Sequence, residues 1–594
     1  MALNHLSAPS LSICTFSGLN QPRNHISLMP SRKSFVPCPI KCTIADTEAI
    51  IRRSANFQPS IWDDSYIQSL KSDYKGGEPY VEQVNKMKIK VKMMLDSAVD
   101  RVKQLELIDT LQRLGLSYHF KEEIQRMIKS LYDTTCTDNT WKNSRGLDLY
   151  ATALEFRILR QHGYKISQDV FSSFQDEKGN FKACISDDIE GMLHLYEATF
   201  LMVGGENILE DARKFTSVHL NRCVEENRDQ DRVFLELVRH ALELPLHWRL
   251  LRIEARWFID VYERIQGMNP TLLEFAKLDF NMVQAMHQAD LQYDSSWWAS
   301  SGLPEKLCFT RDRLMENFLW AVGLGFEPQF GYMRRMNTKV HQLLTTVDDV
   351  YDIYGTLDEL ELFTDVLQRW DIDAIEQLPE YMKMTFFAVY NAMNQIAFTA
   401  LKEQGHNIIP CIKRVWGDLS RTYILEAKWF YSGYKPTLEE YLENGWVSIT
   451  APAILIHAYL VSSPLSKEVL ESLPEYPDII RHPSMIVRLA DDLGTSSDEI
   501  KRGDNPKSIQ CYMNETGGSE EEAREHIHYL ISETWKKINE EHLNADSPWP
   551  PIFKEIALNI ARTAQAMYLY GDGHASQDHK VQARMESLFV TPIP

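Results

Sequence analysis

The sequence has no long uninterrupted apolar run and no cysteine pattern typical of a disulfide or zinc scaffold. A membrane-spanning helix needs about 18 apolar residues. The best candidate, Pro452–Leu465, is interrupted by His457 and by a Ser-Ser-Pro sequence. The nine cysteines are scattered and include no Cys-x-x-Cys pair. We therefore expect no membrane span and no zinc site, and we expect free core thiols in a reducing compartment.

The sequence also contains fewer basic residues than acidic ones. The 63 Lys and Arg residues are outnumbered by 83 Asp and Glu residues, which gives a net charge of −20. Nucleic acids and anionic membranes attract positive surfaces, so we expect neither as a main partner. The composition, with 44% hydrophobic and 25% charged residues, excludes global disorder. The length of 594 residues is enough for more than one large domain.

Acidic residues are missing altogether from residues 1–45, which contain seven serines and a few basic residues. A Ser-rich, basic, acid-free leader resembles an organellar transit peptide. The segment has no compact apolar core of the secretory type, so secretion is not expected. A disordered tail is the alternative, and composition alone does not distinguish plastid from mitochondrion.

From residue 80 onward the chain is a succession of helical patterns, whereas alternating patterns typical of strands are nearly absent. Apolar residues recur at spacings of three and four in five early segments, Val81–Gln104, Leu105–Leu114, Phe120–Tyr132, Leu147–His162 and Ile189–Leu201. We place a domain boundary near Gly267–Pro270, at turn-forming residues. The sequence thus predicts two all-α domains in tandem.

The first acidic cluster is the Asp-Asp-x-x-Asp formed by Asp348, Asp349 and Asp352. On a helix, Asp348 and Asp352 share one face, and stepping back by fours from Asp348 leads to Leu344 and Val340. The carboxylates thus end a mainly apolar stripe, where they resist desolvation unless a cation neutralises them. Oxygen ligands suit Mg²⁺ or Mn²⁺. A charged helix end beside a turn is the alternative.

The second cluster spaces Asp491, Thr495 and Glu499 at intervals of four residues. On a helix they form a stripe about 12 Å long, and two acids with a hydroxyl offer hard oxygen ligands to a cation. Arg488 lies three residues earlier on the same face, where it could hold a phosphate oxygen. A solvated helix face is the alternative.

The basic counterpart is the pair Arg311 and Arg313, which precedes an apolar helix containing Trp320. Two arginines flanking one residue suit a polyanion, although a salt bridge at a helix start is as plausible. Trp320 by itself fits a core position. Without the acidic clusters, neither feature would indicate a site.

Two acidic clusters with arginines describe a cage for metal ions and a diphosphate. The sequence contains no Gly-rich phosphate loop, hydrolase motif or His-Glu-x-x-His. A cage without a nucleophile suggests that the diphosphate itself leaves, with its charge stabilised by metals and arginines. The remaining carbocation needs an apolar, water-excluding pocket, in which the ring face of Trp320 could stabilise positive charge.

Two further features are candidates for shaping the product. His341 lies two helical turns before Asp348 and is expected to line the pocket floor, where it could hold a water or accept a proton. A core histidine bonded to a carbonyl is the alternative. Pro452 removes a helical donor and clashes with the carbonyl of Ser448, so carbonyls from Ser448 to Thr450 could point at positive charge. A plain kink is equally compatible.

Together these motifs resemble plant terpene synthases of the class I, ionisation-initiated type, over essentially the whole chain. Arg52-Arg53, followed after eight residues by Trp62, resembles the tandem-arginine motif of the monoterpene-forming branch. The resemblance implies a plastid transit peptide (1–45), a non-catalytic N-terminal α-barrel domain (46–268) whose N-terminal strand caps the active site, and a C-terminal catalytic α-bundle (269–594). It also implies geranyl diphosphate as substrate and a monomeric enzyme.

The resemblance further implies the roles of individual residues. It makes Asp348, Asp352, Asp491, Thr495 and Glu499 ligands of Mg²⁺ or Mn²⁺, with three ions when diphosphate is bound. Diphosphate would contact Arg311, Arg313 and Arg488, together with Asp348, Asp352 and Asp491. The residues with catalytic roles would be Asp349, Trp320, Arg52 and Arg53. The residues that shape the product would be His341, Ser448 and Thr450. Arg52 and Arg53 would favour isomerisation to a linalyl intermediate, and Tyr570–His574 resembles the family's lid. Asp491 departs from relatives that carry Asn there, but it keeps an oxygen ligand.

Other functions remain open on the sequence alone. The product could be acyclic, of the linalool type, or the substrate could be farnesyl diphosphate. A chain-elongating prenyl transferase would resemble a duplicated Asp-Asp-x-x-Asp, which is not found here. A di-iron oxidoreductase needs paired Glu-x-x-His on core helices, and neither Glu403/His406 nor Glu525/His528 lies on an apolar face. A non-catalytic helical scaffold is the third alternative.

Overall fold

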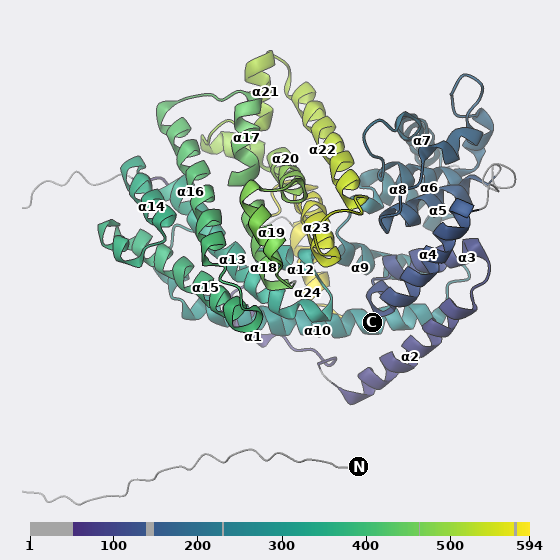
Figure 1. Cartoon of the computed structure of the whole chain (residues 1–594), viewed down its shortest axis with the longest axis horizontal. Coiled ribbons are helices and arrows are strands. Elements are labelled where there is room, and N and C mark those ends of the chain that lie inside the picture. Colours follow the sequence, from purple (N-terminus) through teal and green to yellow (C-terminus); the bar gives the residue numbers. More distant parts are fainter. Residues whose placement is uncertain (1–51, 76, 138–147, 228–230, 463, 575–578) are drawn as a thin grey trace, which may run out of the picture. The chain divides into compact units, whose positions relative to one another are not determined.

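Helices joined by short turns build the part of the chain that the computed structural model describes, residues 52–75, 77–137, 148–227, 231–462, 464–574 and 579–594 (Figure 1). Within these ranges no β-strand is present, and the one extended pairing is an isolated antiparallel bridge between Gln175 and Phe181. The prediction of an all-α fold is confirmed. The expected transit peptide, residues 1–45, lies outside the described residues.

The first group of α-helices covers the N-terminal half of the described chain. Its members are α1 (Asp64–Ser69), α2 (Glu78–Ser97), α3 (Arg101–Arg113), α4 (Lys121–Thr137), α5 (Leu149–Gln161), α6 (Ile189–Thr199), α7 (Asn207–Glu226), α8 (Arg232–Glu243) and α9 (Leu251–Tyr262). One sequence expectation was wrong here, because α2 stops at Ser97. Asp100 then caps a new helix by accepting a hydrogen bond from the Lys103 amide, which an Asp at this position is well suited to do.

The second group begins with a 31-residue helix, α10, at the expected domain boundary. Its members are α10 (Pro270–Ser300), α11 (Leu303–Lys306), α12 (Leu314–Leu324), α13 (Gly331–Asp349), α14 (Leu357–Arg369), α15 (Glu380–Gln404), α16 (Ile409–Ser432), α17 (Leu438–Ser448), α18 (Ala451–Ser462), α19 (Lys467–Ser472), α20 (Asp478–Arg502), α21 (Ser508–Thr516), α22 (Glu520–His542), α23 (Pro551–Tyr568) and α24 (His579–Phe589). Asn269 caps α10, and Pro270 occupies its first turn, a pairing that favours helix initiation.

Helices α12, α13, α16, α17, α18, α20 and α23 pack against one another as a bundle in the second group (Figure 1). α13 packs on α12 and α18, and α20 packs on α17 and α23. Side chains from these helices surround one cavity, described below. The bundle therefore brings segments between residues 311 and 574 to a single site.

One stretch of the described chain, Leu438–Ser462, is long and apolar enough to cross a membrane when α17 and α18 are counted together. This corrects the expectation that no segment qualifies. Of its most apolar window, 72% is buried inside the protein. The core helix of a soluble protein passes the same test, so the finding is weak evidence for a membrane span.

Two of the cysteines also depart from expectation. Cys223 and Cys511 are buried free thiols, as predicted, but Cys184 and Cys308 are exposed. The scattered pattern of cysteines therefore did not predict which of these thiols are buried.

Candidate active site

The first acidic cluster lies where α13 ends. Asp348 and Asp349 occupy its last turn, and the chain then continues as a π-helical turn, η7 (Val350–Tyr354), which carries Asp352. The expectation of one regular α-helix through Asp352 was wrong, because the wider turn changes the register after Asp349. Asp348 and Asp352 nevertheless both line the cavity. Single π-turns of this kind are frequent at functional sites.

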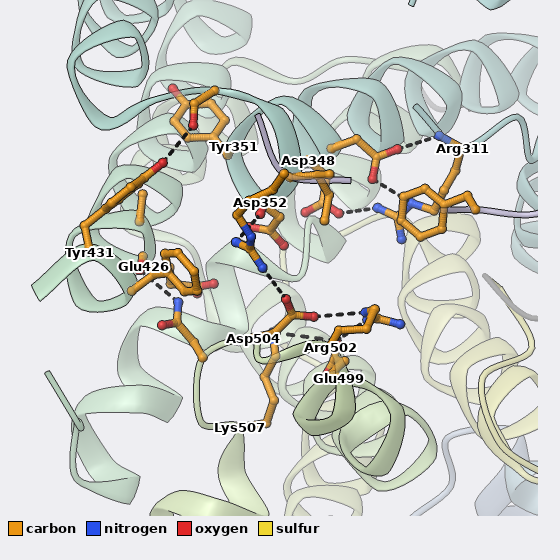
Figure 2. Close-up of a pocket in the computed structure, with 18 residues that line it drawn as sticks. Arg311, Asp348, Tyr351, Asp352, Glu426, Tyr431, Glu499, Arg502, Asp504 and Lys507 are labelled. Carbon is orange, nitrogen blue, oxygen red and sulfur yellow. Dashed lines mark hydrogen bonds and ion pairs between the residues drawn. The ribbon is translucent and has the colours of Figure 1, made fainter. Parts of the chain in front are cut away.

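The second acidic cluster lies on α20, as expected. Asp491, Thr495 and Glu499 all line the same cavity as Asp348 and Asp352. The two clusters thus face one cavity from helices about 140 residues apart in sequence, and α13 and α20 are brought together because both pack on α18. A second cavity adjoins this one and shares Asp348, Asp352 and Glu499 with it. Figure 2 shows this second cavity, with Asp348 and Asp352 on one side and Glu499 on the other.

Several oxygen atoms of the second cluster are suited to a cation. Thr495 Oγ1 and Glu499 Oε2 are buried and form no hydrogen bond within the described part of the chain, which is costly for a polar atom unless a ligand completes its contacts. Burial and the neighbouring Glu499 and Asp492 carboxylates raise the pKa of Asp491 to about 7, despite the opposing effect of Arg488. These hard oxygen donors fit Mg²⁺ or Mn²⁺.

The carboxylates do not close around a single ion by themselves. Among the described residues, no three His, Cys, Asp or Glu side chains are gathered closely enough to hold one metal. Asp348 instead forms an ion pair with Arg311. A cation at Asp348 would therefore have to displace or share this contact, and the remaining ligands would have to come from a bound molecule.

Arg311 is held by both neighbouring aspartates of the first cluster. Its amide donates to Asp349 Oδ2 at 2.6 Å, and its Nε lies 2.9 Å from Asp349 Oδ1. Burial raises the pKa of Asp349 to about 7, although Arg311 opposes the shift. Asp349 is fully buried and contacts the arginine, so in this structure it orients Arg311 rather than facing the main cavity.

The other two predicted arginines differ in their placement. Arg488 lines the cavity; its Nε donates to the Gly445 carbonyl at 3.1 Å, and its Nη1 lies 3.0 Å from Asp492. Arg313 is 1% exposed, and its Nη2 donates to the Gln58 carbonyl at 3.1 Å. Arg313 is therefore not among the residues that line the described cavities, and it anchors the N-terminal segment instead.

Aromatic and apolar side chains form the deeper wall of the cavity. Trp320 on α12 lies with its ring centroid 6.3 Å from that of His341 on α13 and 6.2 Å from that of Tyr568 on α23. Leu344 and Ile454 complete this wall. Such a surface excludes water and offers ring faces to a positive charge.

His341 combines both of the roles considered from the sequence. Its Nδ1 donates to the Asn337 carbonyl at 2.7 Å, whereas its Nε2 is buried and has no hydrogen-bond partner among the described residues. Burial lowers the pKa of His341 to about 4, outweighing the bond to Asn337. The ring is therefore neutral near pH 7, with the Nε2 lone pair available as an acceptor on a residue that lines the cavity.

Between α17 and α18 the chain breaks instead of forming the expected proline kink. Pro452 lies in the first turn of α18, and Thr450 adopts a positive φ of 69°, a strained conformation for a β-branched residue. Ser448, Ile449 and Thr450 all line the cavity. Because Pro452 has no amide hydrogen, it cannot donate to the Ser448 carbonyl.

Arg53 lines the cavity that adjoins the main one, and Arg52 lies beside it in the chain and contacts the segment that follows the first acidic cluster. Both Nη atoms of Arg52 bond the Glu359 carboxylate at 2.8 Å, and the guanidinium stacks over the rings of Tyr354 and Tyr381. The bonds from Arg52 and other donors lower the pKa of Glu359 to about 2 despite its partial burial. Arg53 Nη1 donates to the Asp352 carbonyl at 2.9 Å. The segment is extended rather than paired as a β-strand.

Family models match most of the chain. The N-terminal domain of terpene synthases matches residues 61–242, and the metal binding domain of the terpene synthase family matches residues 299–537. The chain is 58% identical to terpene synthase 10 of Ricinus communis, over 93% of this chain and 99% of that protein. The chain belongs to the terpene synthase family. The resemblance inferred from its motifs is confirmed.

Further relatives of this terpene synthase carry more specific names. It is 56% identical to a (−)-α-terpineol synthase of Vitis vinifera, over 100% of this chain and 99% of the relative. It is also 56% identical to a chloroplastic myrcene synthase of Quercus ilex, over 95% and 94% of the two chains.

Two solved structures share the fold. A limonene synthase with 2-fluorolinalyl diphosphate has a TM-score of 0.89 and 45% identity, covering 92% of this chain and all of that one. An isoprene synthase from grey poplar, in complex with three Mg²⁺ ions and dimethylallyl-S-thiolodiphosphate, has a TM-score of 0.82 and 44% identity, covering 90% and 99%. These likenesses place the all-α architecture within the terpene synthases.

The structure of this terpene synthase also identifies site residues that the motifs missed. Glu426 and Tyr423 on α16 line the cavity with Lys507. Burial opposes charge on Lys507, but Glu499 and Glu426 outweigh it and raise its pKa above the ordinary value. Polar residues on the buried face of α16 were a possible signal for Glu426. Lys507 lies beyond the helix that carries the motif and gave no signal.

The described residues that follow α23, 569–574, reach the cavity. Asp572 and His574 line it, and the Asp572 side chain accepts from the His574 amide at 3.0 Å. Gly494 on α20 makes room for this loop, because a Cβ there would lie 3.1 Å from the Gly571 carbonyl oxygen. This segment therefore packs directly on the helix of the second acidic cluster, and its role as a lid stays a prediction.

Proposed function

We propose that this protein is a monoterpene synthase that ionises geranyl diphosphate with the help of Mg²⁺. The observation that carries the proposal is the lining of the cavity, which combines the two oxygen-rich clusters and three arginines, Arg311, Arg488 and Arg502, with the apolar side chains of Trp320, Leu344 and Ile454. A molecule with a diphosphate head and an apolar tail matches that combination. The names of the relatives, among them terpineol and myrcene synthases, support the same class of enzyme.

The metal ligands in this proposal are Asp348 and Asp352 on one side and Asp491, Thr495 and Glu499 on the other. Mg²⁺, or Mn²⁺, supplies positive charge that balances the diphosphate when bound. The isoprene synthase complex with three Mg²⁺ ions supports three ions here. Arg311 and Arg488 bind the diphosphate oxygens, and Arg313 contributes by holding the N-terminal segment beside them.

After ionisation, the chain's own side chains control the allylic cation. Arg52 and Arg53 keep the N-terminal segment over the cavity, which excludes water while the substrate isomerises to a linalyl form. Trp320 presents an aromatic surface to the cation. His341 directs the outcome, because its free Nε2 can accept a proton and give an olefin, or bind a water and give an alcohol. Carbonyls between Ser448 and Thr450 stabilise positive charge nearby.

We also infer the organisation and setting of the enzyme. Residues 46–268 form a non-catalytic domain and residues 269–594 the catalytic one. The leader at residues 1–45 directs the chain to plastids, a location supported by relatives named chloroplastic. The partner is a small prenyl diphosphate, and we propose a monomer that binds neither nucleic acid nor a membrane.

Gas chromatography of products formed from geranyl diphosphate and Mg²⁺ tests the function. We expect monoterpenes and free diphosphate, with no turnover when EDTA removes the metal. Farnesyl diphosphate in parallel tests the sesquiterpene alternative. A requirement for isopentenyl diphosphate as co-substrate would contradict the proposal and indicate chain elongation.

A further inference from the structure

Asp504, in the short loop after α20, contacts two arginines from different parts of the chain. Its Oδ1 lies 2.9 Å from Arg53 Nη2, and its Oδ2 accepts from Arg502 Nε at 3.1 Å. We propose that Asp504 is a positioning residue that fastens the N-terminal segment, residues 52–60, to the helix of the second metal motif. This inference rests on the proposed function and names the residue through which the segment is held.

Arg53 spans the mouth of the cavity between the two acidic motifs. One guanidinium nitrogen donates to the Asp352 carbonyl in the π-turn, and the other reaches Asp504 beyond the second motif. Its guanidinium also lies 4.1 Å from the ring centroid of Phe430. Asp504 is the one carboxylate paired with Arg53 among the residues that the structure describes. Without Asp504, the arginine keeps its contact with the first motif but loses the second.

The backbone ties Asp504 directly to the second motif. α20 ends at Arg502, and the next residue, Gly503, turns the chain with a φ of 79°; the Asp504 amide then donates to the carbonyl of Glu499 at 3.1 Å. Such a closing bond is typical of helix C-termini with a left-handed glycine. Asn505 Nδ2 holds the loop to α16 through the Glu426 carbonyl at 2.8 Å. Any shift of Glu499 on ligand binding is therefore transmitted to Asp504 over a single hydrogen bond.

Charge in this region makes the coupling sensitive to the metal site. Arg502 Nη2 lies 3.9 Å from Glu499 Oε1, so Glu499 and Asp504 share this arginine (Figure 2). A divalent cation at Glu499 would repel the Arg502 guanidinium. Arg502 would then keep Asp504 as its acidic partner. A carboxylate has acceptor sites enough for two arginines, so Asp504 can hold Arg502 and Arg53 together. Metal binding thus favours a closed N-terminal segment.

Hydrogen exchange of the full-length protein tests the coupling without requiring turnover. We would compare amides of residues 54–62 in the native protein, Asp504→Asn, Arg53→Gln and the double variant. Asp504→Asn should speed exchange there at least threefold, and the double variant should exchange no faster than the faster single variant. Asp504→Glu should restore slow exchange. Asp365→Ala, which breaks an exposed pair with Arg369, is the matched control and should leave the segment unchanged.

Addition of Mg²⁺ with inorganic diphosphate provides the second arm. The native protein should gain further protection in residues 54–62, and Asp504→Asn should lose that gain. With geranyl diphosphate, Asp504→Asn should lower the cyclic product fraction to the value of Arg53→Gln. The inference would be overturned by an unchanged exchange rate of residues 54–62 in Asp504→Asn. It would also be overturned if the rate increases of the two single variants multiplied in the double variant. Absence of native turnover would refute the proposed function, whereas the exchange result would still decide the role of Asp504.

Discussion

Replacing Thr495 with valine removes one buried hydroxyl while keeping the branched shape of the side chain. Thr495 is 5% exposed, and its Oγ1 has no hydrogen-bond partner among the residues that the structure describes. A buried hydroxyl without a partner costs about 1–3 kcal/mol. The metal-free Thr495→Val variant should therefore be more stable than the native protein, by about 1 kcal/mol because the cavity beside Oγ1 relieves part of the cost.

The same substitution should stabilise the fold but weaken the binding of Mg²⁺. If Thr495 supplies a ligand, its loss should weaken apparent Mg²⁺ affinity at least tenfold, since removing even an outer-shell partner of a metal ligand costs about 10–100-fold. Thr495→Ser keeps the oxygen and should retain affinity within a few fold. Thermal unfolding in EDTA would measure the first effect, and a Mg²⁺ titration of product formation the second.

Because the expected changes in stability and in Mg²⁺ affinity have opposite signs, the two measurements together distinguish a metal ligand from a packing residue. A residue that serves only packing would lose stability on replacement and leave the Mg²⁺ requirement unchanged. A Thr495→Val variant that is less stable without metal, with a native Mg²⁺ titration, would therefore refute the assignment. It would also remove the argument that an unpartnered oxygen marks the metal site.

Four further outcomes are expected. Asp348→Ala should lower turnover by orders of magnitude with unchanged helical circular dichroism, and near-normal turnover at saturating Mg²⁺ would exclude it as a ligand. A chain that starts at Ser54, and so lacks Arg52 and Arg53, should ionise geranyl diphosphate but regain cyclic products only from linalyl diphosphate; equal loss with both substrates would mean a structural role. His341→Phe should shift the product ratio with little effect on total ionisation, as judged by gas chromatography, and an unchanged profile would show that the ring faces away from the cation. Glu316 is buried with its pKa raised to about 7 from 4.5, so the folded protein retains a proton that the unfolded chain releases, and the contribution of Glu316 to stability falls as the pH rises from 4.5 to 7. Glu316→Gln should remove this share of the pH dependence, which urea unfolding at pH 5 and 8 would show as a gain at pH 8 of at most about 3 kcal/mol; a loss of stability at both pH values would contradict the reasoning.

Local sequence was sufficient for features that depend on neighbouring residues. Spacings of three and four predicted helices because a helix repeats every 3.6 residues, and Asn269-Pro270 marked the start of α10 because both residues act within the first turn. The spacing of Asp491, Thr495 and Glu499 correctly placed their side chains on one face of a single helix. Local spacing did not predict the π-turn at Asp352 or the break at Thr450.

The sequence by itself determined the helical class and the chemistry of the metal and diphosphate motifs, since composition, periodicity and residue type carry that information. Only the tertiary structure decided which groups meet. Arg52 reaches Glu359 across 307 positions, and Arg53 reaches Asp504 across 451. Glu426 and Lys507 enter the cavity from segments that no motif marks. Such contacts depend on how helices pack side by side, and the spacing of residues along the chain does not predict that packing.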